Sequence, residues 1–558
     1  MNNRYTKPVV VLTAVVAIIA VGIQSVRNDF GLGRNMEVIA NMMRALYTSY
    51  VDEINPDDML RSGATGITAK LDPYTVFLAE SEMDDFETLT TGKYGGIGAL
   101  IRQKEDYVII AEPYKGSPAV RAGLKIGDKI VAIDGKDAKG FTTADVSKRL
   151  KGEPNTTVRV TIESLIDGSR KEHKIKRERI AIPSIAYYGY VADGIGYIRH
   201  ADFTDTCYDD MRNAILELQK TGNLQSLILD YRNNGGGVMQ SAVKIMSLFV
   251  PKGTKILETR GRKSTIESFS TEYEPLLPDT PIAVLINGNS ASSAEIVAGA
   301  IQDLDRGVLI GQRSFGKGLV QSTAHIGFGN YVKLTTAKYH IPSGRCIQAV
   351  RYTADGRAQS MPDSLVGEFS TARGRKVYDG GGIKPDIATE PKYVSNFAVA
   401  LYLSGVIDDF GDDYMRRHHA DTIDNGTFSI TDADYEGFAR LVAERDIPYK
   451  SESRRALDAL RTALDKERLG ESMGDALKDI DSRLHDDKIS NLRTYRKEIE
   501  DYINSNIVLR FSYAAGEIEN SLTDDADVQQ AIAVLRDKER YESITAGLPI
   551  ADGQRQAD

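Results

Sequence analysis

The sequence is poor in the residues that build metal centres and disulfide frameworks. Among its 558 residues there are two cysteines, seven histidines and no tryptophan. Cys207 and Cys346 match no metal-ligand spacing, and because unpaired cysteine is usually buried, we interpret both as packed thiols. The sequence therefore predicts no metal site, and it leaves a disulfide between the two cysteines open.

An excess of positive charge is also missing. The 79 acidic residues outnumber the 70 lysines and arginines, which gives a formal net charge of -9 and a pI near 5.5. A nucleic-acid-binding protein normally has a basic face, so no nucleic-acid partner is expected. The length and a hydrophobic fraction of 41% are instead typical of a protein of about three or four domains with large buried cores.

One uninterrupted apolar run occurs at the N-terminus. Arg4 and Lys7 precede residues 9–23, and the uncharged stretch between positions 8 and 26 is enough for roughly 28 Å of helix. This pattern predicts that residues 1–27 form an inner-membrane anchor, with the basic end in the cytoplasm and the remaining chain facing the periplasm. The alternative is a signal peptide cleaved near Ala-Val-Gly at residues 20–22, which would release the chain into the periplasm.

The rest of the chain divides into four parts by its hydrophobic pattern. Residues 28–91 carry apolar side chains at helical spacing, and residues 92–180 alternate short β-rich runs with glycine turns. Residues 181–392 alternate strands and helices, which predicts a parallel or mixed sheet with the functional site beyond the carboxyl ends of its strands. Residues 393–558 combine many charged residues with apolar residues at helical spacing, which predicts a helical domain.

A serine and a lysine in the strand-and-helix part have the chemistry of a hydrolase pair. Residues 289–295 read Asn-Ser-Ala-Ser-Ser-Ala-Glu at the start of a predicted helix, and Lys317 follows Ser292 by 25 positions (317 minus 292). A serine hydroxyl needs a base to become a nucleophile, and a neutral lysine amine can be that base without histidine. Because the ordinary lysine pKa is about 10.4, we expect an apolar pocket that lowers the pKa of Lys317 toward neutrality.

These segments resemble the C-terminal processing (tail-specific) peptidases, the PDZ-containing members of peptidase family S41. The family pattern runs Ser-Ala-Ser-Ala-Ser-Glu-Ile and then Gly-Lys-Gly-x-x-Gln, and the turn Asp-Tyr-Arg-Asn-Asn-Gly-Gly-Gly at residues 230–237 belongs to the same resemblance. The resemblance implies that Ser292 is the nucleophile, that Lys317 is the general base and that Gln321 orients the lysine. It also implies an oxyanion hole built from the backbone amides of Gly236 and Ser293.

Three serines compete for the nucleophile position. The middle serine of the family pattern falls on Ser292, but the next two residues read Ser-Ala where the family has Ala-Ser, so Ser293 is the main rival. Because a serine before a helix commonly caps it, we assign Ser290 to capping and Ser292 to chemistry. Glu295 and Asp303 recur in the family motifs and are interpreted as supports of this helix, not as proton carriers.

Three glycine-containing elements in residues 92–180 resemble a PDZ domain. They are Gly-Gly-Ile-Gly at 95–98, Ser-Pro-Ala-x-x-Ala-Gly-Leu at 117–124 and Gly-Asp-x-Ile at 127–130. Successive amides of a glycine-rich loop can hold a chain-terminal carboxylate, and an exposed strand edge can pair with an extended peptide. The predicted edge strand is residues 97–101. The predicted carboxylate loop consists of Tyr94, Gly95, Gly96, Ile97 and Gly98.

Two competing kinds of site fail in their sequence contexts. Residues 311–317 fit the first seven positions of a phosphate-binding P-loop, but Gly318 stands where the Mg²⁺-binding Ser or Thr belongs. A histidine triad is also disfavoured, because His200, His325 and His340 lie in no recognisable triad motif.

The combined expectation is a membrane-anchored serine endopeptidase of α/β and α+β architecture. A PDZ-like domain and a ClpP/crotonase-like mixed-sheet protease core are expected between helical terminal segments. Its partners would be the membrane and proteins or peptides with free C-terminal tails, and the helical segments are expected to pack on the core or to join subunits. The resemblance implies no cofactor. The alternatives are a catalytically silent PDZ scaffold and an adaptor in the cell envelope, for example in peptidoglycan processing.

Overall fold

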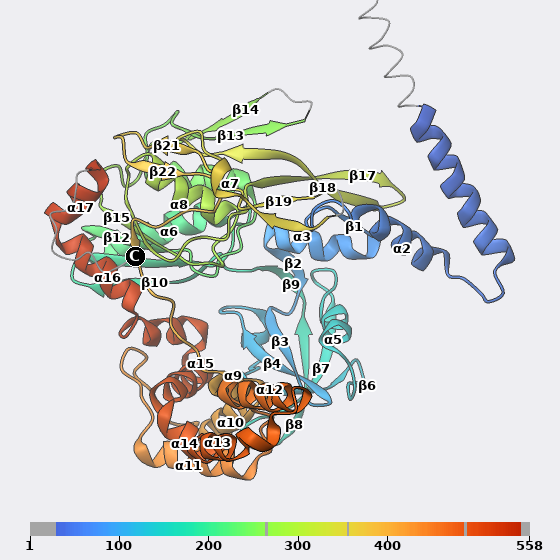
Figure 1. Ribbon diagram of the computed structural model, residues 1–558, viewed down its shortest axis with the longest axis vertical. Helices are drawn as coiled ribbons and strands as arrows, with labels where there is room; N and C mark the ends of the chain where they lie inside the picture. The colour runs from blue at the N-terminus through green and yellow to red at the C-terminus, as the bar shows by residue number, and fades with distance from the viewer. Residues whose placement is uncertain (1–29, 263–265, 354–355, 485–487, 548–558) are drawn as a thin grey trace, which may run out of the picture. The chain divides into compact units, whose positions relative to one another are not determined.

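The computed structural model describes residues 30–262, 266–353, 356–484 and 488–547 (Figure 1). The chain divides into two compact units. The first unit contains the chain up to Ser81 together with Gln321–Thr335 and Tyr352–Ala358. The second unit contains all other residues, and both Ser292 and Lys317 belong to it.

The first unit is built from helices and short antiparallel strands. A helix spans residues 30–49, and α2 (Pro56–Thr68) follows it. The side chain of Asn55 caps α2, and a proline fills the first helical position, where no helical hydrogen bond is lost. β1 (Val76–Leu78) pairs with the first part of β18 (Asn330–His340), which also pairs with β17 (Leu319–Gly327).

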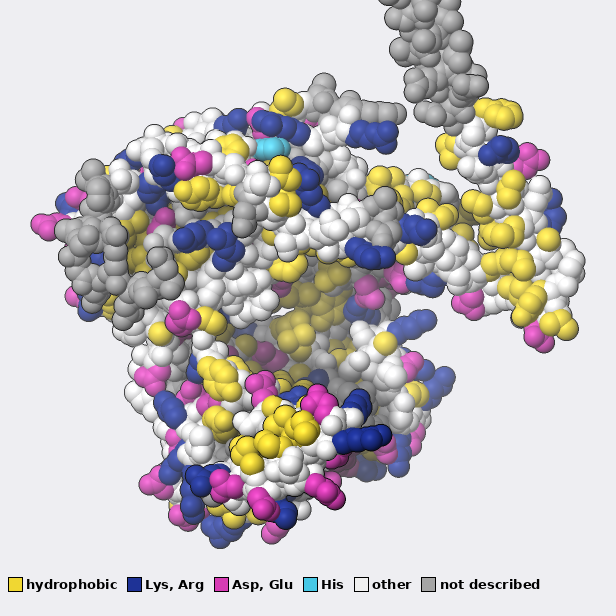
Figure 2. All heavy atoms as spheres, in the orientation of Figure 1, with side chains coloured by type: hydrophobic (Ala, Val, Ile, Leu, Met, Phe, Trp, Pro, Cys, Tyr) yellow, Lys and Arg dark blue, Asp and Glu magenta, His cyan; other side chains and the backbone are white. Residues whose placement is uncertain are grey.

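Apolar side chains of the helix at residues 30–49 are exposed in the described chain. Figure 2 shows yellow side chains along this helix, and Phe30 and Val38 are 74% and 60% exposed. Exposed apolar surface of this kind is typical of interaction sites. The association of subunits through helical segments stays a prediction.

The predicted membrane location is corrected by the structure. Crossing a bilayer takes about 20 consecutive, mostly apolar residues in a helix. In the described part of the chain no helix is long and apolar enough, and even α15 (Arg496–Leu522) carries charged residues along its length. The prediction of an inner-membrane protein facing the periplasm is therefore not retained, and its predicted anchor at residues 1–27 lies outside the described residues.

An antiparallel sheet ordered β3-β4-β5-β7-β8 forms the PDZ-like part of the second unit. Its buried Val and Ile side chains pack against α5 (Thr143–Leu150), whose N-terminus has a capping box. β3 (Ala99–Lys104) is one of the two edge strands and begins two residues after the predicted start. β2 (Lys93–Gly96) and β9 (Glu178–Ala181) pair at the two ends of this part. The other elements here are α3 (Met83–Thr91), β4 (Tyr107–Pro113), α4 (Pro118–Arg121), β5 (Lys129–Ile133), β6 (Lys136–Asp137), β7 (Thr157–Glu163) and β8 (Arg170–Lys176).

A six-stranded sheet ordered β10-β11-β12-β15-β16-β23 forms the core of the second unit. All neighbours are parallel except β10 and β11, and β12 (Ser226–Asp230) and β15 (Ile282–Ile286) are buried along their whole length, as continuous apolar runs predict. The helices α6 (Cys207–Thr221), α7 (Met239–Met246) and α8 (Ser293–Asp303) pack on one face. The helices α16 (Ala526–Arg536) and α17 (Lys538–Ala546), red in Figure 1, pack on the other. The remaining strands of the sheet are β10 (Ile185–Ala192), β11 (Ile195–His200), β16 (Val308–Gly311) and β23 (Ile387–Ala388).

The helices that precede α16 have an apolar core of their own and contact the PDZ-like part. Lys104 on β3 forms ion pairs with Asp409 (2.9 Å) and Asp412 (2.7 Å) on α10, and the amide of Ala514 on α15 donates to Glu112 on β4 (3.0 Å). The helices of this core are α9 (Asn396–Leu403), α10 (Val406–His418), α11 (Asp432–Glu444), α14 (Lys488–Thr494) and α15, whereas α12 (Glu452–Lys466) and α13 (Gly470–Arg483) share a smaller apolar cluster. Short strands β13 (Lys255–Gly261), β14 (Glu267–Ser270), β19 (Val350–Tyr352), β20 (Ala358–Ser360), β21 (Glu368–Ser370) and β22 (Lys376–Tyr378) lie between β12 and β23 in sequence.

Candidate active site

The turns that follow β12 and β15 lie side by side at the carboxyl edge of the sheet. The Ser290 hydroxyl donates to the carbonyl oxygen of Tyr231 (2.8 Å), and the amide of Ala291 donates to the carbonyl oxygen of Asn234 (2.9 Å). Parallel strands end at the same edge of a sheet, so the two turns meet there. The glycine turn at residues 230–237 is therefore next to the serine segment, as the sequence predicts.

Ser290 has a different role from the one predicted. Its hydroxyl oxygen accepts the amide of Asn287 (2.9 Å) and donates to Tyr231, so it fastens the two turns together. The residue that precedes α8 directly is Ser292, and the prediction that Ser290 caps this helix is wrong.

Ser292 occupies a strained position at the start of α8. Its backbone dihedrals are φ 56° and ψ -116°, a conformation that residues other than glycine rarely adopt. Strain of this kind costs on the order of 1–3 kcal/mol and concentrates at functional sites. The side chain is partly exposed at this sharp strand-to-helix turn.

The rival serine is engaged elsewhere. Ser293 is buried, and its hydroxyl donates to the carbonyl oxygen of Gly237 (3.0 Å). Its backbone amide is the first of α8 and so has no acceptor within the helix. This arrangement suits Ser293 to donate its amide and leaves Ser292 as the better nucleophile candidate.

Glu295 joins the backbone of Ser292 to that of Lys317. Carboxylate oxygen Oε2 accepts the amides of Ser292 and Lys317, each at 2.9 Å. Oxygen Oε1 accepts the Ser314 hydroxyl (2.5 Å) and the Gly316 amide (2.7 Å). Burial raises the pKa of Glu295, and the four donors oppose that change. Glu295 thus supports α8, as interpreted from the sequence, and it also holds the lysine loop.

Tyr339 forms a second bridge between the same two residues. Its hydroxyl donates to the carbonyl oxygen of Lys317 (2.7 Å) and lies 3.3 Å from the carbonyl oxygen of Ser292. Burial raises the pKa of Tyr339 well above its ordinary value, so the hydroxyl stays a donor. Neither bridge uses the Ser292 hydroxyl or the Lys317 amine. No local sequence pattern indicates this role of Tyr339, because it lies 22 and 47 positions from its partners.

Gly236 lies directly against the start of α8. Its φ is 88°, and a Cβ atom added there would lie 2.7 Å from the Ser292 Cβ and 2.8 Å from the Ser293 amide nitrogen. Only glycine fits at this distance. The Gly236 amide donates to Asn234 Oδ1 (2.9 Å), so this amide has to leave that oxygen before it can serve an oxyanion.

Asn234 is a further residue of this turn that the sequence reasoning missed. It is buried, and its side-chain amide donates to the carbonyl oxygen of His200 (2.7 Å). An Asn directly before a glycine run is a common turn signal and was available in the sequence. Asn234 fixes the turn whose glycines approach Ser292.

Gln321 belongs to the first unit of the chain. Its side-chain amide donates to the Thr335 hydroxyl (3.3 Å), and that hydroxyl donates to Asp72 Oδ1 (3.0 Å). The orientation of Lys317 by Gln321 stays a prediction.

The predicted carboxylate loop runs from β2 into β3. The carbonyl oxygens of Gly95, Ile97 and Gly98 accept the backbone amides of Gly152 (3.1 Å), Ala119 (2.9 Å) and Tyr114 (2.9 Å), respectively. These three hydrogen bonds hold the backbone of the loop in place. The Ile97 side chain is 2% exposed and belongs to the core of the PDZ-like part. Its contribution to a ligand would therefore come from the backbone.

Tyr94 covers part of this loop. A Cβ atom added at Gly96 would lie 2.6 Å from the Tyr94 ring. Burial raises the pKa of Tyr94, and the neighbouring backbone amides of Ala99 and Gly98 oppose this only in part. A tail carboxylate held by those amides would lie close to the Tyr94 hydroxyl.

His200 is buried in the core behind the site. Its ring lies 4.3 Å from that of Phe203 and 5.3 Å from that of Tyr231, measured between centroids, and burial lowers the pKa of His200 to about 3. Among the described residues, no group of three His, Cys, Asp or Glu side chains is placed to hold a metal ion.

Replacing Tyr339 with phenylalanine tests the second bridge. The substitution removes the hydroxyl and leaves two partly buried carbonyl oxygens without it, so we expect a loss of about 1 kcal/mol in the free energy of unfolding. We also expect a lower kcat for any hydrolysis at Ser292, because the lysine loop is held less firmly. Denaturant unfolding and kcat measurements check both, with Tyr378→Phe at an exposed tyrosine as control. Wild-type values for both quantities in Tyr339→Phe would contradict the bridge.

Three family models match parts of the chain. Peptidase family S41 matches residues 194–357, and a PDZ domain matches residues 109–164. A model described as the C-terminal helical domain of a probable PDZ-protease matches residues 397–535. Together with the sheets and helices described above, these matches confirm the predicted fold class, a PDZ domain and a mixed-sheet S41 protease core with helical terminal segments.

Curated relatives are similar over most of their own length. The carboxy-terminal-processing protease of Bartonella bacilliformis is 33% identical over 332 residues, which are 59% of this chain and 76% of the relative. The probable CtpA-like serine protease of Staphylococcus aureus is 31% identical over 394 residues, which are 69% of this chain and 72% of the relative.

Similar solved structures have low TM-scores. The photosystem II D1 C-terminal processing protease has 26% sequence identity and a TM-score of 0.33, covering 64% of this chain and 87% of that chain. The PDZ domain of a carboxy-terminal protease from Vibrio cholerae, in complex with peptide, has 28% identity and a TM-score of 0.15, covering 16% of this chain and 97% of that chain.

Proposed function

Since the chain belongs to the carboxy-terminal-processing proteases of peptidase family S41, we propose that it cleaves proteins with free C-terminal tails and uses Ser292 as nucleophile and Lys317 as general base. The observation that carries this proposal is the double bridge. Glu295 and Tyr339 each contact the backbones of both residues, so the two side chains start from adjoining backbone positions.

The proposed reaction proceeds through an acyl-enzyme. The Ser292 oxygen attacks the peptide carbonyl carbon while the neutral Lys317 amine takes the hydroxyl proton. The negative charge on the carbonyl oxygen is stabilised by the amide of Ser293 and, after it leaves Asn234, by the amide of Gly236. The C–N bond then breaks as the lysine passes its proton to the leaving amine. Water hydrolyses the ester in the same way and releases Ser292.

We propose that the PDZ domain recognises the substrate tail. The backbone amides of the loop at residues 94–98 and of Ala99 would hold the terminal carboxylate, and the edge strand β3 would pair with the tail. In this proposal the bound carboxylate lies next to the Tyr94 ring, which already packs against Gly96.

A peptide with a free terminal carboxylate is expected to be cleaved faster than its C-terminal amide. Amidation removes the charge that the loop amides would hold, which costs about 1.5–3 kcal/mol, or roughly 10- to 150-fold in binding. Mass spectrometry of the products formed from the two peptides by the full chain measures both cleavage and preference. Tail binding without any cleavage would favour the silent PDZ scaffold.

Two glycine variants make this test specific to the loop. An alanine Cβ at Gly98 would lie 2.5 Å from the Ser117 Cβ, so Gly98→Ala should distort the loop and abolish the preference for the carboxylate. Gly116 has a similar positive φ, 73° against 75°, but a Cβ atom added there would meet no atom within 4 Å. Gly116→Ala therefore introduces a similar backbone strain without the clash, and it should keep the preference for the carboxylate. A preserved preference in Gly98→Ala would place tail recognition elsewhere.

A further inference from the structure

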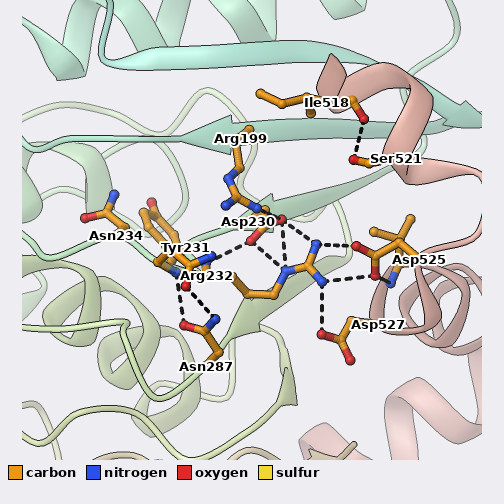
Figure 3. Close-up of polar contacts among 12 residues, drawn as sticks. Arg199, Asp230, Tyr231, Arg232, Asn234, Asn287, Ile518, Ser521, Asp525 and Asp527 are labelled. Carbon is orange, nitrogen blue, oxygen red and sulfur yellow. Dashed lines mark hydrogen bonds and ion pairs between the residues drawn. The ribbon is translucent and has the colours of Figure 1, made fainter. Parts of the chain in front are cut away.

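The glycine turn is held at its base by Arg232 (Figure 3). On one side its guanidinium contacts Asp230 at the end of β12, with Nη2 2.7 Å from Oδ2 and Nε 3.1 Å from both oxygens. Asp230 is fully buried and also accepts the Tyr197 hydroxyl (2.7 Å) and Arg199 Nη1 (2.6 Å). Burial disfavours the ionised form, but Arg232 and Arg199 hold the pKa of Asp230 below its ordinary value.

On its other side Arg232 contacts two carboxylates of the C-terminal segment. Nη1 donates to Asp525 Oδ1 and Asp527 Oδ2, each at 3.0 Å, and Nη2 lies 2.8 Å from Asp525 Oδ2. The side chains of Arg232, Asp525 and Asp527 are only 13%, 19% and 12% exposed. Partly buried, charge-assisted contacts of this geometry are stronger than exposed ion pairs.

The two carboxylates are presented by a firmly packed helix. Asp525 caps α16 by accepting the amide of Val528 (3.0 Å), and Asp527 lies in its first turn. Val528, Ala531 and Val534 on α16 are fully buried against the core sheet. The position of Arg232 is therefore set from two directions, by the end of β12 and by the N-terminus of α16.

This double contact is important because the same turn also contains Gly236, which lies against the start of α8. Residues 230–234 are held by side-chain contacts, and Gly237 is held by the Ser293 hydroxyl and by a bridge to Phe203. Gly235 and Gly236 between them are conformationally permissive. The Gly236 amide has to turn from Asn234 Oδ1 toward the substrate oxygen. A fixed base confines that rearrangement to the glycines.

We propose that Asp525 and Asp527 are positioning residues for peptide hydrolysis, a role that rests on the proposed function. They hold Arg232, Arg232 fixes the base of the glycine turn, and the Gly236 amide is thereby aimed at the oxyanion. The C-terminal helical segment would then be a working part of the active site, although its sequence contains no catalytic motif.

The test uses the full chain with Asp525→Asn, Asp527→Asn and the double variant. Asparagine caps helices as well as aspartate, so Asp525→Asn keeps the cap of α16 and removes only the charge. The double variant is expected to lower kcat about 10- to 100-fold, because small displacements of a catalytic group have effects of that size, while KM changes little. The affinity for a peptide boronic acid, whose serine adduct places an oxygen at the oxyanion position, should fall by a similar factor.

Asp501→Asn is the matched control, because Asp501 lies on α15 and pairs with the exposed Lys392 (2.8 Å). It should leave kcat unchanged. An unchanged kcat in the double variant overturns the proposal, and so does an equal loss of kcat in the control.

Hydrogen exchange separates this proposal from the proposed function. Amides of residues 230–237 should exchange faster in the double variant than in wild type or control. A wild-type chain that cleaves no peptide overturns the proposed function. Unchanged exchange of these amides in the double variant overturns the positioning role, whether or not the wild type cleaves peptides.

Discussion

Alanine at Ser292 or at Lys317 is expected to lower kcat/KM for peptide hydrolysis by about 10⁴-fold or more while the chain stays folded. Ser292→Ala removes the atom that forms the acyl-enzyme, and Lys317→Ala removes the group that takes its proton. The backbone contacts to Glu295 and Tyr339 remain available in both variants. Initial rates and thermal unfolding of the purified variants measure the two expectations.

Two control variants test whether the loss of activity is specific to Ser292 and Lys317. Ser293→Ala removes a hydroxyl that donates to the Gly237 carbonyl oxygen, so it should cost stability but keep most of the activity. His325→Ala changes an exposed residue and should behave like wild type. An active Ser292→Ala variant beside an inactive Ser293→Ala variant would move the nucleophile to Ser293.

Wild-type kcat/KM should also rise with pH, because only the neutral amine can accept the serine proton.

Alanine at Gly236 is expected to lower kcat by about 10²–10³-fold, the effect of losing one oxyanion donor. The added Cβ would lie 2.6 Å from the Ala291 carbonyl oxygen and 2.7 Å from the Ser292 Cβ, so the turn and the serine segment have to separate. The positive φ of 88° adds backbone strain for any residue other than glycine. Steady-state kinetics on the tail peptide measures the loss.

The neighbouring glycine provides the matched control for this substitution. Gly235 is exposed, and a Cβ atom added there meets nothing within 4 Å. Gly235→Ala should therefore keep kcat within a few-fold of wild type. Equal losses in Gly235→Ala and Gly236→Ala would mean that the turn needs general flexibility, not a close approach at Gly236.

Local sequence patterns were sufficient to predict strands and helices of the sheet that positions the site. The apolar run at 282–286 is the strand β15, and the amphipathic stretch at 208–220 falls within α6. Periodicity and glycine turns determine such elements over a few neighbouring residues. The order of strands and helices also predicted the edge of the sheet where the two turns meet.

Contacts between distant parts of the chain could not be predicted in this way. Arg232 and Asp525 are 293 positions apart, and an aspartate at a helix start is explained by capping alone. In the sequence Tyr339 is an ordinary strand tyrosine, whereas in the structure its hydroxyl lies between the carbonyl oxygens of Ser292 and Lys317. The misassignment of Ser290 has the same origin, because its hydroxyl donates to the carbonyl oxygen of Tyr231, 59 positions earlier in the chain.

The most direct test of the central claim is to map the serine that becomes covalently modified. The full chain is treated with a tail peptide that carries a serine-reactive fluorophosphonate, and the modified residue is located by mass spectrometry of the digested protein. The account predicts modification at Ser292, with little or none in the Lys317→Ala variant because its base is missing. Modification at Ser290 or Ser293, or undiminished labelling of Lys317→Ala, would contradict it.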